Sequence, residues 1–232
     1  FEDLWPSQGD YDMNDVVVGY STTFTVDKDN RIVAIRDVVT PLHSGGKLRS
    51  AFGYQLDIPV TAVKGVKIEN GSSTAGLEKN QDKAVVILFD DIEQAVARGP
   101  VSVEIELDGS LSMDKVTRKS LYNPFICVSD KGFVPGAVRK EIHLTNYPPT
   151  SLADPYPFGR NDDKSSLDKA GNPIGPYYYA TSELYPFAID LPVTDYRIPD
   201  EMVKIDVFYP DFAGWVKSRG EKHKEWYKNS VK

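Results

Sequence analysis

Hydrophobic and polar residues alternate through most of the first half of the chain, in short runs separated by turn signals. The run Val16–Val26 is rich in β-branched and aromatic residues and ends at the polar turn Asp27–Asn30. Runs of this kind are typical of half-buried strands. A second run, Arg31–Leu42, follows the turn directly, so the pattern predicts an antiparallel β-hairpin.

Further strand-like runs continue past the middle of the chain: Ala51–Ile58, Gly65–Glu69, Ala84–Phe89, Val101–Leu107 and Phe125–Val128. Helical patterns are confined to two short segments. Residues Asp91–Arg98 stop at a Gly-Pro pair, and near the end Phe212, Trp215 and Val216 recur at helical spacing. Many short strands without alternating helices predict a mainly β protein, an antiparallel β-sandwich of jelly-roll type with long loops and a short C-terminal helix.

The segment 144–192 has a different character, because it is crowded with Pro, Asp, Gly and Tyr and shows little periodicity. Long loops of this kind are usually functional or locally disordered. No composition boundary resembles a linker, so we expect residues 1–232 to form a single domain. Tyr177, Tyr178 and Tyr179 in this loop could offer stacking faces to a sugar, although plain packing of tyrosines explains the same pattern.

Composition narrows the class of protein further. The chain has 232 residues, of which 34 are acidic and 27 basic, for a formal charge of −7. This sign argues against a nucleic-acid partner, since phosphate backbones require a basic face. No apolar run is long enough to span a bilayer, so we expect no transmembrane segment in this chain. The single cysteine, Cys127, lies in an apolar run and leaves no pair for an intrachain disulfide.

The first 15 residues carry the strongest chemical signal. Asp10, Asp12 and Asn14 alternate, as in loops that wrap around a cation with every second side chain turned inward. All the candidate ligands in this segment are hard oxygen donors, without a neighbouring His or Cys. That donor set favours calcium or magnesium over zinc or copper, and calcium tolerates many carboxylates at irregular geometry. We therefore expect a calcium site, with Asp15 either a further ligand or a residue that orients the loop.

Two other interpretations of the acidic segment stay open. Asp and Asn side chains can bond their own backbone in a plain turn, but clustered acids without a cation repel one another. Two carboxylates could instead act as a catalytic acid and base. The sequence contains no nucleophile elbow, zinc-protease helix or phosphate loop, and Gly45-Gly46-Lys47 is interpreted as a hairpin tip. With no complete catalytic constellation, we expect a protein that is not an enzyme.

Blocks of sequence spread over nearly the whole chain resemble the LruC-type domain of bacterial cell-surface proteins and lipoproteins. The opening block, residues 1–17, is joined in order by Glu141–Leu144, Pro148–Thr150, Phe158–Asp163, Tyr185–Ile189, Tyr209–Phe212 with Trp215, and Trp226-Tyr227. The resemblance implies an exported protein of a Bacteroides-type Gram-negative bacterium, located outside the cell or at the outer-membrane surface. It implies no known activity, because the biochemical role of the family is obscure.

The acidic segment is also similar to segments of other extracellular bacterial domains thought to bind calcium. That similarity implies as ligands Asp10, Asp12, Asn14 and Asp15, with Glu2 and Asp3 as candidates to close the shell. The combined expectation is a non-enzymatic surface module of structural or adhesion type, stabilised by calcium, with a cell-surface protein or a glycan as partner. The alternative is a carbohydrate-binding module that uses the tyrosine-rich loop.

Overall fold

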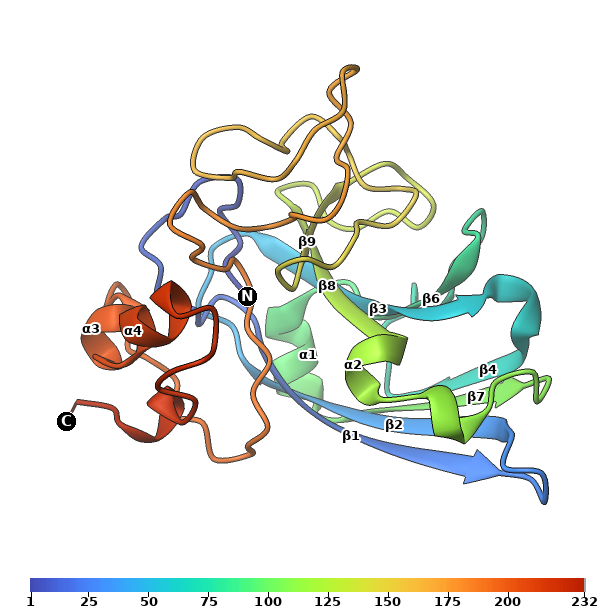
Figure 1. Cartoon of the computed structure of the whole chain (residues 1–232). Helices are drawn as coiled ribbons and strands as arrows, with labels where there is room; N and C mark the ends of the chain where they lie inside the picture. Colours follow the sequence, from blue (N-terminus) through green and yellow to red (C-terminus); the bar gives the residue numbers. More distant parts are fainter. Residues whose placement is uncertain (232) are drawn as a thin grey trace.

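The computed structural model describes residues 1–231 and contains two antiparallel sheets packed face to face (Figure 1). The order of strands is β1-β2-β7-β4 in one sheet and β5-β6-β3-β8-β9 in the other. The predicted antiparallel β-sandwich is therefore confirmed. Its strands are β1 Val17–Val26, β2 Ile32–His43, β3 Arg49–Pro59, β4 Val63–Glu69, β5 Gly76–Leu77, β6 Lys83–Phe89, β7 Val101–Leu107, β8 Tyr122–Ser129 and β9 Lys140–His143.

The helices are short. They are α1 Ile92–Arg98, α2 Arg118–Leu121, α3 Ile205–Phe208 and α4 Phe212–Lys217, with 3-10 turns η1 Val60–Ala62, η2 Met113–Lys115 and η3 Trp226–Lys228. Asp91 caps α1 by accepting a hydrogen bond from the backbone N–H of Gln94, which satisfies one free donor of the first turn. Within residues 1–231, no helix combines the length and the apolar character that a membrane crossing requires.

The β1–β2 hairpin forms where the alternating pattern predicts it, with Thr22 opposite Asp37. Its turn is held by Asp27, whose Oδ1 accepts hydrogen bonds from the backbone N–H groups of Asp29 and Arg31, both at 2.9 Å. The Gly45-Gly46 segment, by contrast, is not a hairpin tip. It joins β2 in one sheet to β3 in the other, so it crosses from sheet to sheet at the edge of the sandwich.

Three apolar clusters organise the molecule. The main core lies between the sheets and extends to Phe1, Trp5 and Val16 at the start of the chain. A second cluster lies on the outer face of the five-stranded sheet, where the loops drawn in yellow and orange cover β8 and β9 (Figure 1). A third cluster forms a separate C-terminal unit around α3, α4 and η3, and it comprises Tyr11, Met13, Tyr185, Ile205, Phe208, Tyr209, Phe212, Val216 and Trp226.

One carboxylate is buried between the two sheets. Asp37 on β2 is 2% exposed and accepts hydrogen bonds from the hydroxyl groups of Thr22, Tyr54 and Tyr122, at 2.6 to 2.9 Å. Both of its oxygens are therefore bonded, as a buried carboxylate requires.

A second buried network lies under the loops that cover β9. Glu141 accepts hydrogen bonds from Arg139 and from Thr150, and His143 Nε2 lies 3.0 Å from its Oε2. Burial raises the pKa of Glu141, but the hydrogen bond and charge of His143 and the charge of Arg139 outweigh it. The pKa of this carboxyl therefore lies below its ordinary value of 4.5.

Candidate metal centre

Residues 10–14 run between the sandwich and the C-terminal unit, and their side chains divide between two environments. Tyr11 and Met13 are buried in the C-terminal cluster. Both adopt positive φ angles, of 57° and 59°, which are uncommon for residues other than glycine. Asp10 and Asp12 lie in a different environment, in a cluster of acidic side chains. The alternation seen in the sequence therefore separates an apolar set from a polar set.

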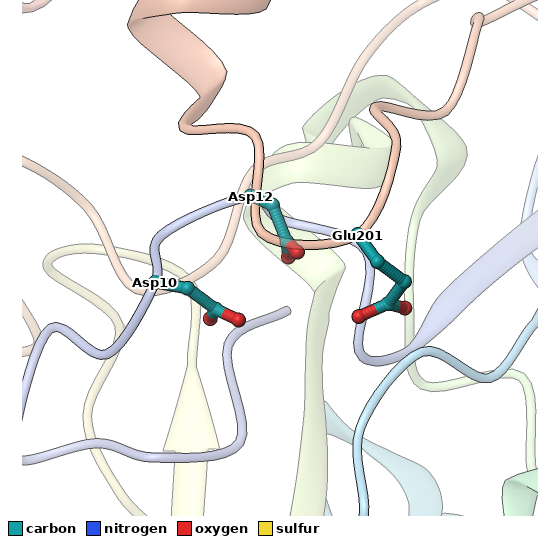
Figure 2. Close-up of side chains that lie close together, drawn as sticks. All are labelled: Asp10, Asp12 and Glu201. Atoms are coloured by element: carbon teal, nitrogen blue, oxygen red, sulfur yellow. The ribbon is translucent and has the colours of Figure 1, made fainter.

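Three carboxylates meet beside this segment. Oxygens of Asp10, Asp12 and Glu201 all lie within 4.8 Å of one another. Figure 2 shows the three side chains turned toward a shared space, two from the N-terminal segment and Glu201 from the loop before α3. Asp12 is 1% exposed, whereas the Glu201 side chain is 55% exposed, so the cluster has a buried side and an open side.

The carboxamide of Asn14 adds a neutral oxygen to this cluster. Asn14 is fully buried, and its Nδ2 donates a hydrogen bond to the carbonyl of Pro199 at 3.1 Å. Its Oδ1 is buried and has no hydrogen-bond partner. A methyl group at Gly45 would overlap both Asn14 Oδ1 and Glu201 Oε1, so these two oxygens lie around one point. An amide oxygen without a donor beside several carboxylates is an arrangement that suits a hard cation.

Backbone hydrogen bonds fix the geometry of the cluster. Asp12 Oδ1 accepts from the N–H of Asn14 at 3.2 Å, and Asp12 Oδ2 accepts from the N–H of Met202 at 3.0 Å. The N–H of Gly45 points at the carbonyl oxygens of Asn14 and Asp15, at 3.3 and 3.2 Å. The acidic segment, the β2–β3 crossing and the loop before α3 are thus held together at this place.

The other predicted ligands form a separate group. Asp15 Oδ2 accepts a hydrogen bond from the N–H of Asp3 at 2.7 Å, and Glu2 Oε1 accepts one from the N–H of Met13 at 2.5 Å. Asp3 and Asp15 lie over Gly46, next to the glycine that adjoins the first cluster. The structure therefore brings Asp10, Asp12 and Asn14 together with Glu201, and places Glu2, Asp3 and Asp15 beside them rather than around the same point.

Burial dominates the electrostatics of the segment. It raises the pKa of Glu2 to about 8, with a further contribution from the charge of Asp15. Burial likewise raises the pKa of Asp15 to about 7, and the charge of Asp3 adds to the shift. The pKa values of Asp3 and Asp12 are also raised, chiefly by burial. Burial and the neighbouring acids therefore oppose ionisation of these carboxyl groups.

The predicted tyrosine platform is divided by the fold. Tyr179 is fully buried and stacks on His143, with ring centroids 5.2 Å apart, so it presents no face to solvent. Tyr177 is 53% exposed. Tyr177 and Tyr178 line a shallow depression of about 210 Å³ together with Lys164 and Arg219. Two of the three tyrosines therefore face a common surface.

Sequence reasoning missed Glu201 and Gly45. Glu201 follows Pro199-Asp200 in a polar stretch that resembles any exposed turn, so no local signal marks it as a ligand. Gly45 was visible only as part of a glycine pair. Both acquire their significance from contacts between segments that lie far apart in the sequence.

The fold and the cluster define a two-sheet antiparallel sandwich with an oxygen-rich centre at its edge. The chain belongs to the DUF4842 family, a domain of unknown function, whose family model matches residues 30–227. Glu201 lies inside the matched range and residues 1–15 lie outside it. The LruC-type resemblance stays a prediction, because the matching family is DUF4842.

The fold recurs in a solved structure. The crystal structure of a "putative lipoprotein" from Bacteroides ovatus matches with a TM-score of 0.67 at 20% sequence identity, covering 100% of this chain and 72% of that chain. No curated protein matches the chain.

Proposed function

We propose that this chain is a non-enzymatic module of the bacterial cell surface, of structural or adhesion type, stabilised by calcium. The ligands of the ion are the carboxylates of Asp10, Asp12 and Glu201 and the amide oxygen of Asn14. The lipoprotein description of the Bacteroides ovatus protein supports a surface location outside the cytoplasm. Extracellular calcium is abundant, so even a weak site would be filled there.

The observation that carries this proposal is the unpartnered oxygen of Asn14. A fully buried amide oxygen without a donor costs free energy unless a ligand satisfies it. Carboxylate oxygens of Asp10, Asp12 and Glu201 surround the same region, and no nitrogen or sulfur ligand takes part. Calcium accepts six to eight such oxygens, with water completing the shell on the exposed side of Glu201.

The role that follows from the geometry is structural. The ion neutralises acids that repel one another and joins the N-terminal segment to the loop before α3. An ion that binds only the folded chain stabilises it by about 2.7 kcal/mol at a hundredfold excess over the dissociation constant. Stability should therefore rise with free calcium.

Thermal unfolding in calcium and in chelator tests the proposal. The parent protein should melt at a higher temperature in calcium, and the double variant Asp10→Asn/Glu201→Gln should lose most of that difference. Neither Asp10 nor Glu201 accepts a hydrogen bond within the described chain. Glu201 Oε1 lies 3.8 Å from His43 Nε2 at an exposed position, so the double variant costs the protein only this one surface contact. The matched control is Asp130→Asn/Glu104→Gln, at two exposed positions. Equal melting temperatures of the parent in both buffers would disprove the calcium site.

Surface location is tested separately in the source bacterium. Antibody against the chain should label intact cells, and protease added outside the cells should remove the label. Labelling that requires lysis of the cells would contradict the surface location without affecting the calcium site.

The second candidate function is glycan binding through the tyrosine-rich loop. The exposed ring of Tyr177 beside Tyr178 and two cationic side chains supports it, because tyrosine rings can stack on sugars. A glycan array should then give saturable binding that Tyr177→Ala abolishes. Tyr156→Ala is the control, since Tyr156 is also exposed but lies outside that depression.

A further inference from the structure

We propose a second calcium site beside the first, formed by the carboxylates of Asp3 and Asp15 over Gly46. This inference rests on the proposed function, because it extends the same metal centre from one ion to two. It assigns a role to two of the predicted ligands that do not reach the first cluster.

The unbonded oxygens of Glu2 and Asp3 distinguish them from the other buried carboxylates. Asp37 and Glu141 have both oxygens bonded to protein donors. Asp163 likewise accepts from Ser165 Oγ and from the N–H groups of Gly159 and Ser165. Glu2 Oε2 and Asp3 Oδ2 are the only buried carboxylate oxygens of residues 1–231 without a partner. Asp37, Glu141 and Asp163 are thus fully bonded, whereas Glu2 and Asp3 each keep one buried oxygen open.

The open oxygen of Asp3 converges with one of Asp15. A methyl group at Gly46 would overlap Asp3 Oδ2 and would lie 2.9 Å from Asp15 Oδ1. Asp15 is itself held in place, since its Oδ2 accepts the N–H of Asp3. Two carboxylate oxygens thus face one point above a residue that has no side chain. The oxygens of this site lie where a Cβ of Gly46 would be, just as Asn14 Oδ1 and Glu201 Oε1 lie where a Cβ of Gly45 would be.

The protein's own cations make no ion pair with this group. Lys140 Nζ donates to the backbone carbonyls of Asp3 and Trp5, at 2.8 and 2.9 Å. The α-amino group of Phe1 donates to the carbonyl of Val16. Within the described residues, neither nitrogen makes an ion pair with a carboxylate within 4.0 Å. Three buried carboxylates without a paired cation require either protonation or an added cation.

The class of ion follows from the donors. Both groups that face Gly46 are carboxylates, and Ca²⁺ is the common biological cation that binds carboxylates in an irregular loop. One calcium in the first site would leave Asp3 and Asp15 without a cation bound to their carboxylates. A second calcium supplies it.

Binding stoichiometry tests this inference on the full chain. Protein stripped with chelator and titrated with calcium by calorimetry should bind two equivalents. Asp3→Asn should bind one, Glu201→Gln should bind one, and the double variant should bind none. Asp130→Asn, an exposed site with the same change of charge, should keep two. One equivalent in the parent, unchanged by Asp3→Asn, would overturn the second site and leave the first intact. No bound calcium would overturn both.

Thermal unfolding of Asp3→Asn distinguishes the loss of a calcium ligand from poor folding of the variant. The substitution removes a buried charge whose Oδ2 makes no hydrogen bond, so it should raise the melting temperature in chelator. It should lower the melting temperature in calcium, because a ligand is lost. A lower melting temperature in both buffers would show that Asp3 acts only through packing and would overturn the second site.

Discussion

The backbone N–H of Met202 donates a hydrogen bond to Asp12 Oδ2 at 3.0 Å, across 190 positions of the sequence. Asp12 is thereby attached to the same loop that supplies Glu201. The N–H of Ile205 reinforces the attachment by donating to the carbonyl of Tyr11 at 2.8 Å. The candidate metal centre consequently lies at the joint between the β-sandwich and the C-terminal unit, whose apolar cluster is separate from the main core.

Removal of calcium should loosen that joint. Trypsin cleavage after Arg197 and Lys204, two exposed residues that flank Glu201, should be faster in chelator than in calcium. Opening of a local unit exposes its chain to protease in proportion to the population of the open form. Cleavage after Lys131, in an exposed loop away from the centre, serves as the control and should proceed at the same rate in both buffers. If cleavage after Arg197 and Lys204 is as fast in calcium as in chelator, the prediction is contradicted.

Gly45→Ala should reduce the response to calcium. The added methyl group would overlap Asn14 Oδ1 and Glu201 Oε1, so the two ligands must move apart. We expect the calcium-induced rise in melting temperature to fall by at least half. Gly65→Ala is the matched control, because the methyl group there meets no atom closer than 3.9 Å. A full response to calcium in Gly45→Ala would show that the oxygens near Gly45 do not bind the ion.

Tyr54→Phe should destabilise the sandwich by about 1.5–3 kcal/mol, the usual contribution of a hydrogen bond to a charged group. It removes the 2.7 Å bond to Asp37 Oδ2 while Tyr122 still donates to the same carboxylate. Urea unfolding monitored by circular dichroism measures the change. Tyr177→Phe removes a hydroxyl from an exposed tyrosine and should leave the free energy of unfolding unchanged.

Glu141 should make folding sensitive to acid. Its pKa in the folded chain lies below the ordinary value of 4.5, so its contribution to stability is complete above pH 4.5 and is lost as the pH falls through the folded value. Glu141→Gln should cost about 1.5–3 kcal/mol at pH 7, because it removes the charged acceptor of the bonds from Arg139, His143 and Thr150, while Arg139 keeps its ion pair with Glu78. The difference in free energy of unfolding between parent and variant should shrink below pH 4.5. A difference independent of pH would contradict this assignment.

Local patterns were sufficient for most of the sandwich. Val101–Leu107 alternates strictly, and β7 has these bounds, with Val101, Val103, Ile105 and Leu107 buried. Strand β5 was missed because Gly76–Leu77 is too short to show a period, and it lies within a polar loop. Strand β9 was missed for a similar reason, since Lys140–His143 is a short edge strand that carries a buried ion-pair network.

Only part of the candidate site could be predicted from local sequence patterns. The alternation of Asp10, Asp12 and Asn14 is a local property, so it could be read from spacing alone. The position of Glu201 beside Asp10 and Asp12 depends on where the chain crosses between sheets at Gly45 and Gly46. The position of Asp3 and Asp15 apart from that cluster depends on the same crossing. Such contacts arise from tertiary packing, so the residues next to them in the sequence do not predict them.

The division of residues 10–14 between two environments also fixes the length of this segment. Tyr11 and Met13 fill an apolar cluster while Asp10 and Asp12 meet at a polar centre, so one inserted or deleted residue would exchange the two sets. Carboxylates would then enter the apolar cluster, and an aromatic ring would face the acidic cluster. Related chains should therefore tolerate insertions in the long loops after β9 and keep this stretch free of them.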